Sequence, residues 1–137
     1  MSTLHIFRGL PGSGKTTAAR KLAEETGAVL IEPDSLLVRN GKYDYTPDRY
    51  RFAVNCAHIM VEVASEVGAD IIYADVLPRR AEVKTIQSFL LCESVYTLEV
   101  HDLKITQEES RKRNKHGVLP EDIERMSYLW EDWESES

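Results

Sequence analysis

A glycine-rich stretch near the start of the chain has residue types and a spacing that could hold phosphate. Residues 8–17 read RGLPGSGKTT, in which four residues separate Gly9 from Gly14, and Lys15 and Thr16 follow. Glycines let successive backbone N–H groups curl around phosphate oxygens, and a helix after the loop points its positive end at the anion. In this pattern the lysine reaches the β- and γ-phosphates and the threonine hydroxyl binds Mg²⁺. The stretch predicts a nucleoside triphosphate site rather than a simple Gly/Pro turn.

Two aspartates follow apolar runs and could act on a phosphate held there. Asp34 comes shortly after the run at 28–31. Phosphoryl transfer needs a carboxylate that orients the acceptor hydroxyl and takes its proton, but an aspartate here could equally cap the following turn. From its position alone, Asp34 is equally consistent with the role of general base and with the role of turn cap. Asp75 ends the apolar run IIYAD, the usual place of a second Mg²⁺ contact beside a phosphate loop, and we expect that role over a bond to its own loop.

Basic residues could close over the phosphates or line an acceptor groove. The stretch RKRNKHG, residues 111–117, puts several cations on and after a short helix. Such cations neutralise charge in a phosphoryl-transfer transition state, although they also suit a solvated helix end. Helical spacing puts Arg111 and Arg113 on different faces, so we expect only one of them to face the phosphates. Arg39 and Arg79 follow the two aspartates and are candidates for the acceptor groove.

The elements that must position these residues alternate along the chain. Short apolar runs predict strands over 4–7, 28–31, 70–74 and 95–100, and capped or periodic segments predict helices over 15–26, 46–67, 79–91, 106–113 and 120–133. This alternation predicts a three-layer α/β fold whose parallel sheet of four to five strands carries helices on both faces. The glycine-rich loop makes it a P-loop NTPase fold, of the kinase-like kind that the resemblance described below implies. Ligands in such sheets bind beyond the carboxyl ends of the strands. The last helix would carry Trp130 and Trp133 on its apolar side.

Composition limits the class of protein. The 137 residues suit one domain over residues 1–134 with an acidic tail at 135–137, and 42% hydrophobic and 29% charged residues are typical of a globular chain. A net charge of −6 argues against a broad basic surface that coats nucleic acid, without excluding a local groove. No apolar run approaches the roughly 20 residues of a membrane span, and the start lacks a signal-peptide pattern. We expect a cytoplasmic location and no membrane partner, while the oligomeric state stays open.

Other chemistries find little support in the sequence. Cys56 and Cys92 lie in apolar-periodic segments and are expected to be buried free thiols. The histidines, at positions 5, 58, 101 and 116, show no ligand spacing, and no C-x-x-C occurs. Residues 12–14 have only the core of the G-x-S-x-G pattern, so serine hydrolysis is unsupported. A GTPase would need further guanine-reading motifs, and no NKxD is present.

Several stretches together resemble a known family. RGLPGSGKTT, the aspartate after the second strand, RNGKYDYTP and RNKHGVLPEDIERM are similar to the kinase domain of bacteriophage-type polynucleotide 5′-hydroxyl kinases. They are still more similar to the NEDD4-binding-protein-2-like ATP-binding proteins. The resemblance covers about residues 4–133, and its late stretch is more specific than the phosphate loop. It implies ATP, Mg²⁺ and transfer of the γ-phosphoryl group to a hydroxyl, typically the 5′-OH of DNA or RNA.

The resemblance also implies roles for single residues. Lys15 and Thr16 match the phosphate-loop pair, and Asp34 matches the general base. Asp75 matches the acid that ends the third strand, and Arg113 matches a lid arginine. The candidate residues are then, for catalysis, Lys15, Asp34 and Arg113; for the nucleotide, Gly9, Pro11, Gly12, Ser13, Gly14, Lys15, Thr16, Thr17, Arg111 and Arg113; for the metal, Thr16 and Asp75; and for the acceptor, Asp34, Arg39 and Arg79.

The chain departs from the family pattern around the acceptor. The family commonly has Thr-Asn after the third-strand acid, where this chain has Val-Leu-Pro at 76–78. The family's substrate arginine corresponds to Leu37, with Arg39 two residues later, and His116 stands where some relatives have a second lid arginine. Three functions therefore stay open: a kinase of nucleic-acid 5′-hydroxyls, a kinase of a nucleoside, nucleotide or other small hydroxyl compound, and a nucleotide-gated binding protein with little turnover.

Overall fold

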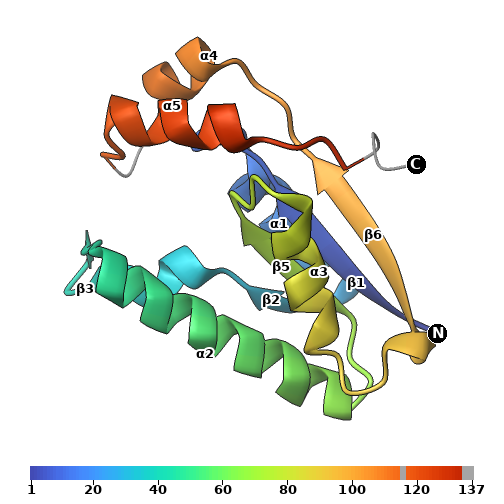
Figure 1. Ribbon diagram of the computed structural model, residues 1–137. Coiled ribbons are helices and arrows are strands. Elements are labelled where there is room, and N and C mark those ends of the chain that lie inside the picture. The colour runs from blue at the N-terminus through green and yellow to red at the C-terminus, as the bar shows by residue number, and fades with distance from the viewer. Residues whose placement is uncertain (115–116, 134–137) are drawn as a thin grey trace.

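The computed structural model describes residues 1–114 and 117–133 and has a parallel sheet with helices on both sides (Figure 1). Its strands are β1 (Ser2–Arg8), β2 (Val29–Ile31), β5 (Ile71–Asp75) and β6 (Tyr96–Asp102), in the order β2-β5-β1-β6 with every neighbouring pair parallel. The helices are α1 (Lys15–Thr26), α2 (Pro47–Glu66), α3 (Arg80–Ser88), α4 (Gln107–Arg113) and α5 (Pro120–Leu129). The predicted parallel sheet of four to five strands between helical layers is confirmed.

Strand β5 shows how the sheet is buried on both faces. Side chains alternate between the faces of a strand, so Ile71 and Tyr73 point to one side and Ile72 and Ala74 to the other. The first pair joins the core formed with α2 and α3. The second pair packs with Ala19 of α1. Both layers of the core therefore meet at the strand that ends in the predicted metal ligand, and this explains why the strand reads as a continuous apolar run.

Several helix boundaries follow the capping residues expected from the sequence. The Thr46 hydroxyl accepts the Arg49 N–H at 3.1 Å before α2, and Thr106 and Glu109 form the predicted capping box at α4. Helix α1 ends at Gly27, which has a left-handed φ of 73°. None of the helices in the described parts of the chain is long and apolar enough to cross a membrane.

Two helices end earlier than predicted, and for α5 the following segment makes tertiary hydrogen bonds instead of continuing the helix. Helix α3 stops at Ser88 rather than at residue 91, and α5 stops at Leu129 rather than at residue 133. After α5 the chain extends, and the Glu131 N–H donates to the Pro78 carbonyl at 2.7 Å. The Trp133 N–H then donates to the Asp102 carboxylate at 3.1 Å. The two tryptophans therefore do not share a helix face, and the prediction that they do is wrong.

A short 3-10 helix and a hairpin between β2 and α2 were not predicted. The 3-10 helix is η1 (Pro33–Leu37), and the hairpin consists of β3 (Val38–Arg39) and β4 (Lys42–Tyr43). Its two-residue turn has φ values of 52° at Asn40 and 77° at Gly41, which suit the Asn-Gly turn that hairpins favour. The dipeptide in RNGKY was the available signal. The hairpin matters because it carries Tyr43 toward the predicted base.

Neither cysteine is buried, which corrects the sequence prediction. Both thiols are free, but Cys56 is half-buried and Cys92 is exposed. Cys56 lies beside the buried Ala57 on α2, and a step of one residue rotates a side chain by about 100° away from the buried stripe. Cys92 lies beyond the end of α3, in the turn before β6, where no helical periodicity applies.

Candidate active site

The glycine-rich loop joins β1 to α1 at the carboxyl ends of the strands (Figure 1). Gly12 and Gly14 have φ values of 80° and 89°, which side-chain-bearing residues rarely adopt. A Cβ on Gly12 would lie 2.6 Å from the Cβ of Arg113, so α4 packs directly on the loop. The Ser110 hydroxyl of α4 also donates to the Pro11 carbonyl at 2.6 Å, in a buried hydrogen bond. The loop conformation and the close approach of α4 both depend on glycine.

Lys15 begins α1 and is buried, with 8% of its surface exposed. Burial lowers the pKa of Lys15, while the nearby carboxylates of Asp75, Asp34 and Glu32 act in the opposite direction. Within the described residues its ammonium makes no hydrogen bond or ion pair. A buried cation without a direct partner is costly, and a bound anion would offset that cost. The charge of Lys15 therefore suits phosphate.

Asp75 ends β5 and is held by two hydrogen bonds. Its Oδ1 accepts the Val76 N–H at 2.8 Å and its Oδ2 accepts the Tyr50 hydroxyl at 2.5 Å. Burial, and then the nearby Asp34 carboxylate, raise the pKa of Asp75 to about 6, although these hydrogen bonds and Lys15 favour the ionised form. Asp75 thus bonds its own loop, which was the alternative interpretation, and still lines the same cleft as Lys15.

Asp34 lies in η1 and is held by the hairpin. Its Oδ1 accepts the Tyr43 hydroxyl at 3.0 Å, and burial together with the Asp34 charge raises the pKa of Tyr43. The Tyr43 and Tyr45 rings stack with centroids 6.4 Å apart, and Tyr45 also contacts Tyr50 at 6.0 Å. These tyrosines are absent from the predicted site, although YDYTPDRY places three of them in eight residues.

One cleft of about 1070 Å³ contains both groups of residues. Its lining includes Pro11, Gly12, Gly14, Lys15, Thr16, Thr17, Arg20, Asp34, Tyr43, Tyr45, Tyr50, Asp75, Lys112, Arg113 and Arg125. We call residues 11–17 the loop end of the cleft, and Asp34 with Tyr43, Tyr45 and Tyr50 the tyrosine end. The volume reaches the upper limit of ordinary ligand pockets, about 1,000 Å³, and leaves room for a nucleotide and part of a second substrate. Predicted residues from distant parts of the sequence therefore meet in one place.

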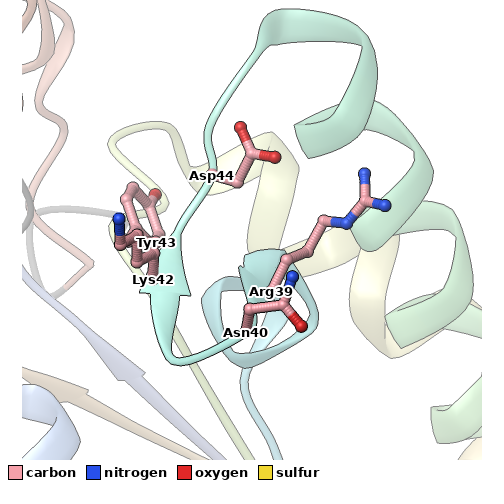
Figure 2. A pocket seen from close by; sticks show the side chains of 5 residues that line it. All are labelled: Arg39, Asn40, Lys42, Tyr43 and Asp44. Carbon is pink, nitrogen blue, oxygen red and sulfur yellow. The ribbon is translucent and has the colours of Figure 1, made fainter.

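Other predicted residues lie away from the cleft lining. Arg111 and Arg79 are exposed and do not line it. Arg39 lies on the hairpin, where it lines a separate pocket of about 400 Å³ and points away from the Tyr43 ring (Figure 2). His116 and the tail at 135–137 lie outside the described residues.

Two further predicted loop residues, Gly9 and Ser13, pack against each other. The Ser13 hydroxyl is buried and has no hydrogen-bond partner within the described residues, and a Cβ on Gly9 would lie 2.3 Å from it. Neither residue lines the cleft. Glycine is therefore required at position 9, because a side chain there would collide with Ser13 and with the Leu103 carbonyl oxygen.

Arg113 lines the cleft but is held by its own helix. Its guanidinium pairs with Glu109 at 3.3 Å, and 58% of the side chain is exposed. An exposed ion pair four residues apart contributes little stability, about 0.3–0.5 kcal/mol. Turning the Arg113 side chain toward a phosphate would therefore cost little.

An unpredicted residue, Arg8, fixes the base of the loop. It is fully buried, and its Nε and Nη2 donate to the Leu77 carbonyl at 3.0 and 2.8 Å. Its Nη1 pairs with Asp102 at 3.2 Å, and the guanidinium lies 4.2 Å from the centre of the Trp130 ring. Arg8 thus joins the ends of β1, β5 and β6 to the end of α5. A charged residue ending an apolar strand was the signal for it.

The family relationship follows from a match over most of the chain. The family model AAA_33, an AAA domain, matches residues 4–124 of the 137. The chain belongs to this AAA domain family. The match covers the glycine-rich loop, Asp34 and Asp75, so it contains most of the residues that line the cleft, although Arg125 lies just beyond it.

Solved structures show which fold this AAA domain has. A chain of the Pnkp1/Rnl/Hen1 RNA repair complex matches it with a TM-score of 0.67 and 20% identity, over 93% of this chain and 43% of that one. A gluconokinase from Sinorhizobium meliloti 1021 matches with 0.67 and 16%, over 98% and 78% of the two chains. A shikimate kinase from Acinetobacter baumannii in complex with shikimate matches with 0.58 and 15%, over 94% and 74%. The AAA domain therefore has the P-loop kinase-like α/β fold, and it spans less than half of the repair-complex chain.

Proposed function

We propose that this AAA domain is an ATP-dependent phosphotransferase that moves the γ-phosphoryl group to a hydroxyl, with the 5′-OH of DNA or RNA as the leading acceptor. The observation that carries the proposal is the meeting of Lys15, Asp34 and Asp75 in one cleft. A fold shared with kinases of different acceptors supports the reaction class, whereas the acceptor rests on the tyrosine end.

The residues at the loop end fit a triphosphate and Mg²⁺. Gly12 and Gly14 have left-handed φ values, which allow a loop to turn its backbone N–H groups toward an anion, and Lys15 lacks a direct partner within the described residues. The Thr16 hydroxyl and the Asp75 carboxylate are oxygen ligands, the type that Mg²⁺ prefers. Thr16 and Asp75 would hold the Mg²⁺, which would supply positive charge to neutralise the phosphates. Lys15 and Arg113 would then bind and orient the phosphates from the two sides of the loop.

The tyrosine end fits the acceptor hydroxyl. One oxygen of Asp34 accepts the Tyr43 hydroxyl, and the other makes no hydrogen bond within the described residues. That second oxygen can accept the proton of an incoming hydroxyl as the hydroxyl oxygen attacks the γ-phosphorus and the bond from that phosphorus to the ADP oxygen breaks, so that ADP leaves. Tyr43 holds the carboxylate in place during this step, so that the base does not rotate away from the acceptor.

The exposed tyrosines support a nucleic-acid acceptor. The Tyr43 and Tyr45 rings are nearly parallel, at 12°, and 49% of Tyr45 is exposed. Single-stranded nucleic acids bind by stacking bases on such rings, at about 1–3 kcal/mol per base, and cations then track the backbone. Arg39 and Lys42 supply cations on the same hairpin. The fold also occurs in a chain of an RNA repair complex.

A small-molecule kinase is the second candidate. The similar folds of a gluconokinase and a shikimate kinase favour it, as does the absence of an amide in residues 76–78. A net charge of −6 also suits a small acceptor better than a long polyanion. A nucleotide-gated binding protein is the third candidate, and the acids at the cleft argue against it.

Transfer of labelled γ-phosphate from ATP separates these candidates. The full chain is incubated with Mg²⁺ and 5′-OH DNA or RNA oligonucleotides, or with a panel of nucleosides, gluconate and shikimate. We expect label in the oligonucleotides and none in matched oligonucleotides that already carry a 5′-phosphate. Label only in a small compound would overturn the nucleic-acid acceptor and keep the phosphotransferase. Tight ATP binding with no transfer to any acceptor would overturn both.

A further inference from the structure

A group of possible metal ligands lies outside the cleft, on the sheet face that α1 covers. Strands β1 and β6 are parallel neighbours, with His5 opposite Glu99 and Phe7 opposite His101. Side chains two residues apart on a strand share a face, so all four project to the same side of the sheet. Phe7 packs there with Ala19 of α1. Pairing of the two strands thus places two imidazoles and a carboxylate side by side.

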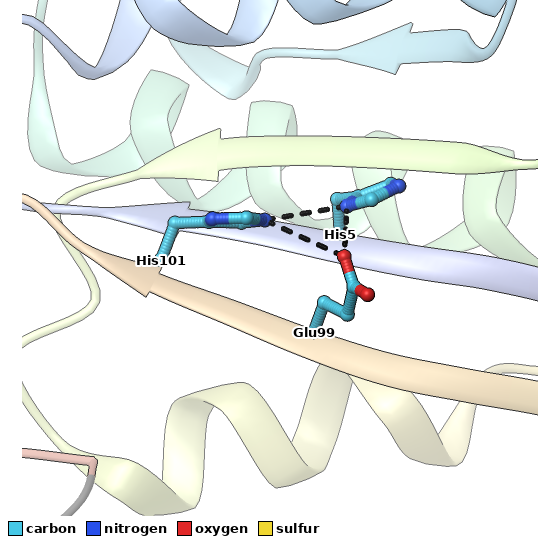
Figure 3. Close-up of side chains that lie close together, drawn as sticks. All are labelled: His5, Glu99 and His101. Carbon is cyan, nitrogen blue, oxygen red and sulfur yellow. Dashed lines mark hydrogen bonds and ion pairs between the residues drawn. The ribbon is translucent and has the colours of Figure 1, made fainter.

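The three ligand atoms are spaced as a bound metal requires (Figure 3). The Nδ1 of His5 lies 3.3 Å from the Nε2 of His101 and 3.2 Å from the Oε2 of Glu99. The third separation, between His101 Nε2 and Glu99 Oε2, is 3.9 Å. A point equidistant from atoms so spaced lies about 2.0 Å from each, which is the length of zinc bonds to histidine nitrogen and carboxylate oxygen.

We propose that His5, Glu99 and His101 form a binding site for a divalent transition metal, with Zn²⁺ as the leading ion. A neutral imidazole nitrogen carries one lone pair or one proton. Without a metal, the Nδ1 of His5 can either donate a proton to Glu99 Oε2 or accept one from His101 Nε2, but it cannot do both. A cation between the three atoms accepts a lone pair from each, which no arrangement of protons on these atoms achieves. The metal therefore explains why the three atoms converge.

The ligand types distinguish this site from the Mg²⁺ position proposed in the cleft. Two imidazoles with one carboxylate suit Zn²⁺, Co²⁺, Ni²⁺ or Cu²⁺, whereas Mg²⁺ prefers oxygen ligands alone. None of the three residues lines the cleft. The side chains of Glu99 and His101 are 52% and 39% exposed, so water can reach a fourth coordination position.

The surroundings indicate a structural role for the metal. The Phe7 ring stacks on His101 with centroids 4.3 Å apart and a 12° angle, which holds the imidazole in place. Strand β1 continues from His5 to Arg8, whose partner Asp102 directly follows His101. A metal would therefore join β1 to β6 close to the contact that fixes the base of the phosphate loop. Because the site needs the folded strands, the metal should stabilise the folded state by mass action.

Metal titration of the purified full chain, freed of metal with EDTA, tests the proposal. We expect one Zn²⁺ per chain by calorimetry, a rise in Tm with added Zn²⁺, and visible d–d absorption with Co²⁺. Micromolar Mg²⁺ should produce no such rise in Tm. None of these three readouts depends on enzyme activity, so failure here leaves the proposed function untouched.

A pair of histidine variants assigns the site. His101→Gln removes one ligand from a half-exposed position, so we expect a folded protein whose zinc affinity falls by about tenfold or more. His58→Gln changes a half-buried histidine on α2 and should bind Zn²⁺ as the wild type does. Equal zinc affinity in His101→Gln and the wild type would overturn the proposal. So would binding of less than one Zn²⁺ per chain, or binding at millimolar concentration only.

Discussion

At the loop end of the cleft, Lys15, Thr16 and the two left-handed glycines come from one stretch of ten residues, whereas the tyrosine end joins Asp34, Tyr43 and Tyr50 from three elements. The loop end keeps a cation without a direct partner within the described residues. At the tyrosine end the Asp34 carboxylate accepts the Tyr43 hydroxyl, and the Tyr50 hydroxyl donates to Asp75. A strong local motif thus specifies where phosphate is held. Contacts between distant segments specify where the γ-phosphoryl group would go.

Lys15→Ala should have the largest effect, and it should abolish both ATP binding and transfer. The ammonium supplies charge to the phosphates in the ground state and the transition state, so we expect transfer to fall by about a thousandfold. Because the buried lysine has no ion pair within the described residues, its removal should leave Tm unchanged or higher. ATP titration and thermal unfolding measure both effects. Lys21→Ala, on the exposed side of α1, is the matched control.

If Lys15→Ala transferred phosphate at the wild-type rate, the assignment of the loop end as the triphosphate-binding part of the cleft would be contradicted. If the variant binds ATP normally and fails only in transfer, Lys15 stabilises the transition state but does not contribute to ATP binding.

Asp75→Asn should reduce phosphoryl transfer while it raises the stability of the metal-free protein. The raised pKa of Asp75, about 6 against 3.8 for a free group, means that the folded state binds this proton more tightly than the unfolded chain. Its contribution to stability is therefore lost as pH rises from about 4 to about 6, and it stays lost above that. At about pH 7.5 we expect the metal-free variant to be more stable than the wild type by up to about 3 kcal/mol.

Urea unfolding in EDTA at about pH 7.5 and about pH 4.5 checks this sign. The stability gain of Asp75→Asn should shrink at the lower pH, while transfer with Mg²⁺ should be strongly reduced at neutral pH. A variant that is less stable than the wild type at neutral pH would show that the ionised carboxylate stabilises the fold.

Tyr45→Ala should have the smallest effect and should change only the tyrosine end. The ring is half-exposed and stacks on Tyr43, so we expect the KM for oligonucleotides to rise by about tenfold while ATP affinity stays unchanged. Tyr128→Ala, on the exposed surface of α5, is the control. If the KM for oligonucleotides is unchanged in Tyr45→Ala, Tyr45 does not stack on the bases of the acceptor, and a small acceptor is favoured.

The parts that the sequence predicts well are those encoded locally. The glycine spacing, the Thr46 and Thr106 caps and the alternating strands lie in single segments, and the structure has them. Asp34 was predicted, but the tyrosines beside it were not, because Tyr43 reaches Asp34 only through the hairpin turn at residues 40–41. The length of α5 was wrong because contacts of the following segment with β6 and Pro78, invisible in periodicity, end the helix.

The histidines show the same limit. His5 and His101 have no ligand spacing along the chain, since 96 positions separate them. Parallel pairing of β1 with β6 removes that separation and sets both beside Glu99. Only the Glu-x-His pattern at 99–101, two ligands on one face of a strand, was visible in the sequence.

The central claim is that Asp34 takes the proton of the acceptor hydroxyl, and Asp34→Asn tests it most directly. The asparagine keeps the shape of the side chain and can still accept the Tyr43 hydroxyl, but it cannot take a proton. Transfer of labelled γ-phosphate to a 5′-OH oligonucleotide is measured for the wild type, Asp34→Asn and the exposed control Asp48→Asn. We predict that transfer by Asp34→Asn falls by about a hundredfold or more, with ATP affinity within about twofold of the wild type. Unchanged turnover in Asp34→Asn would contradict the account.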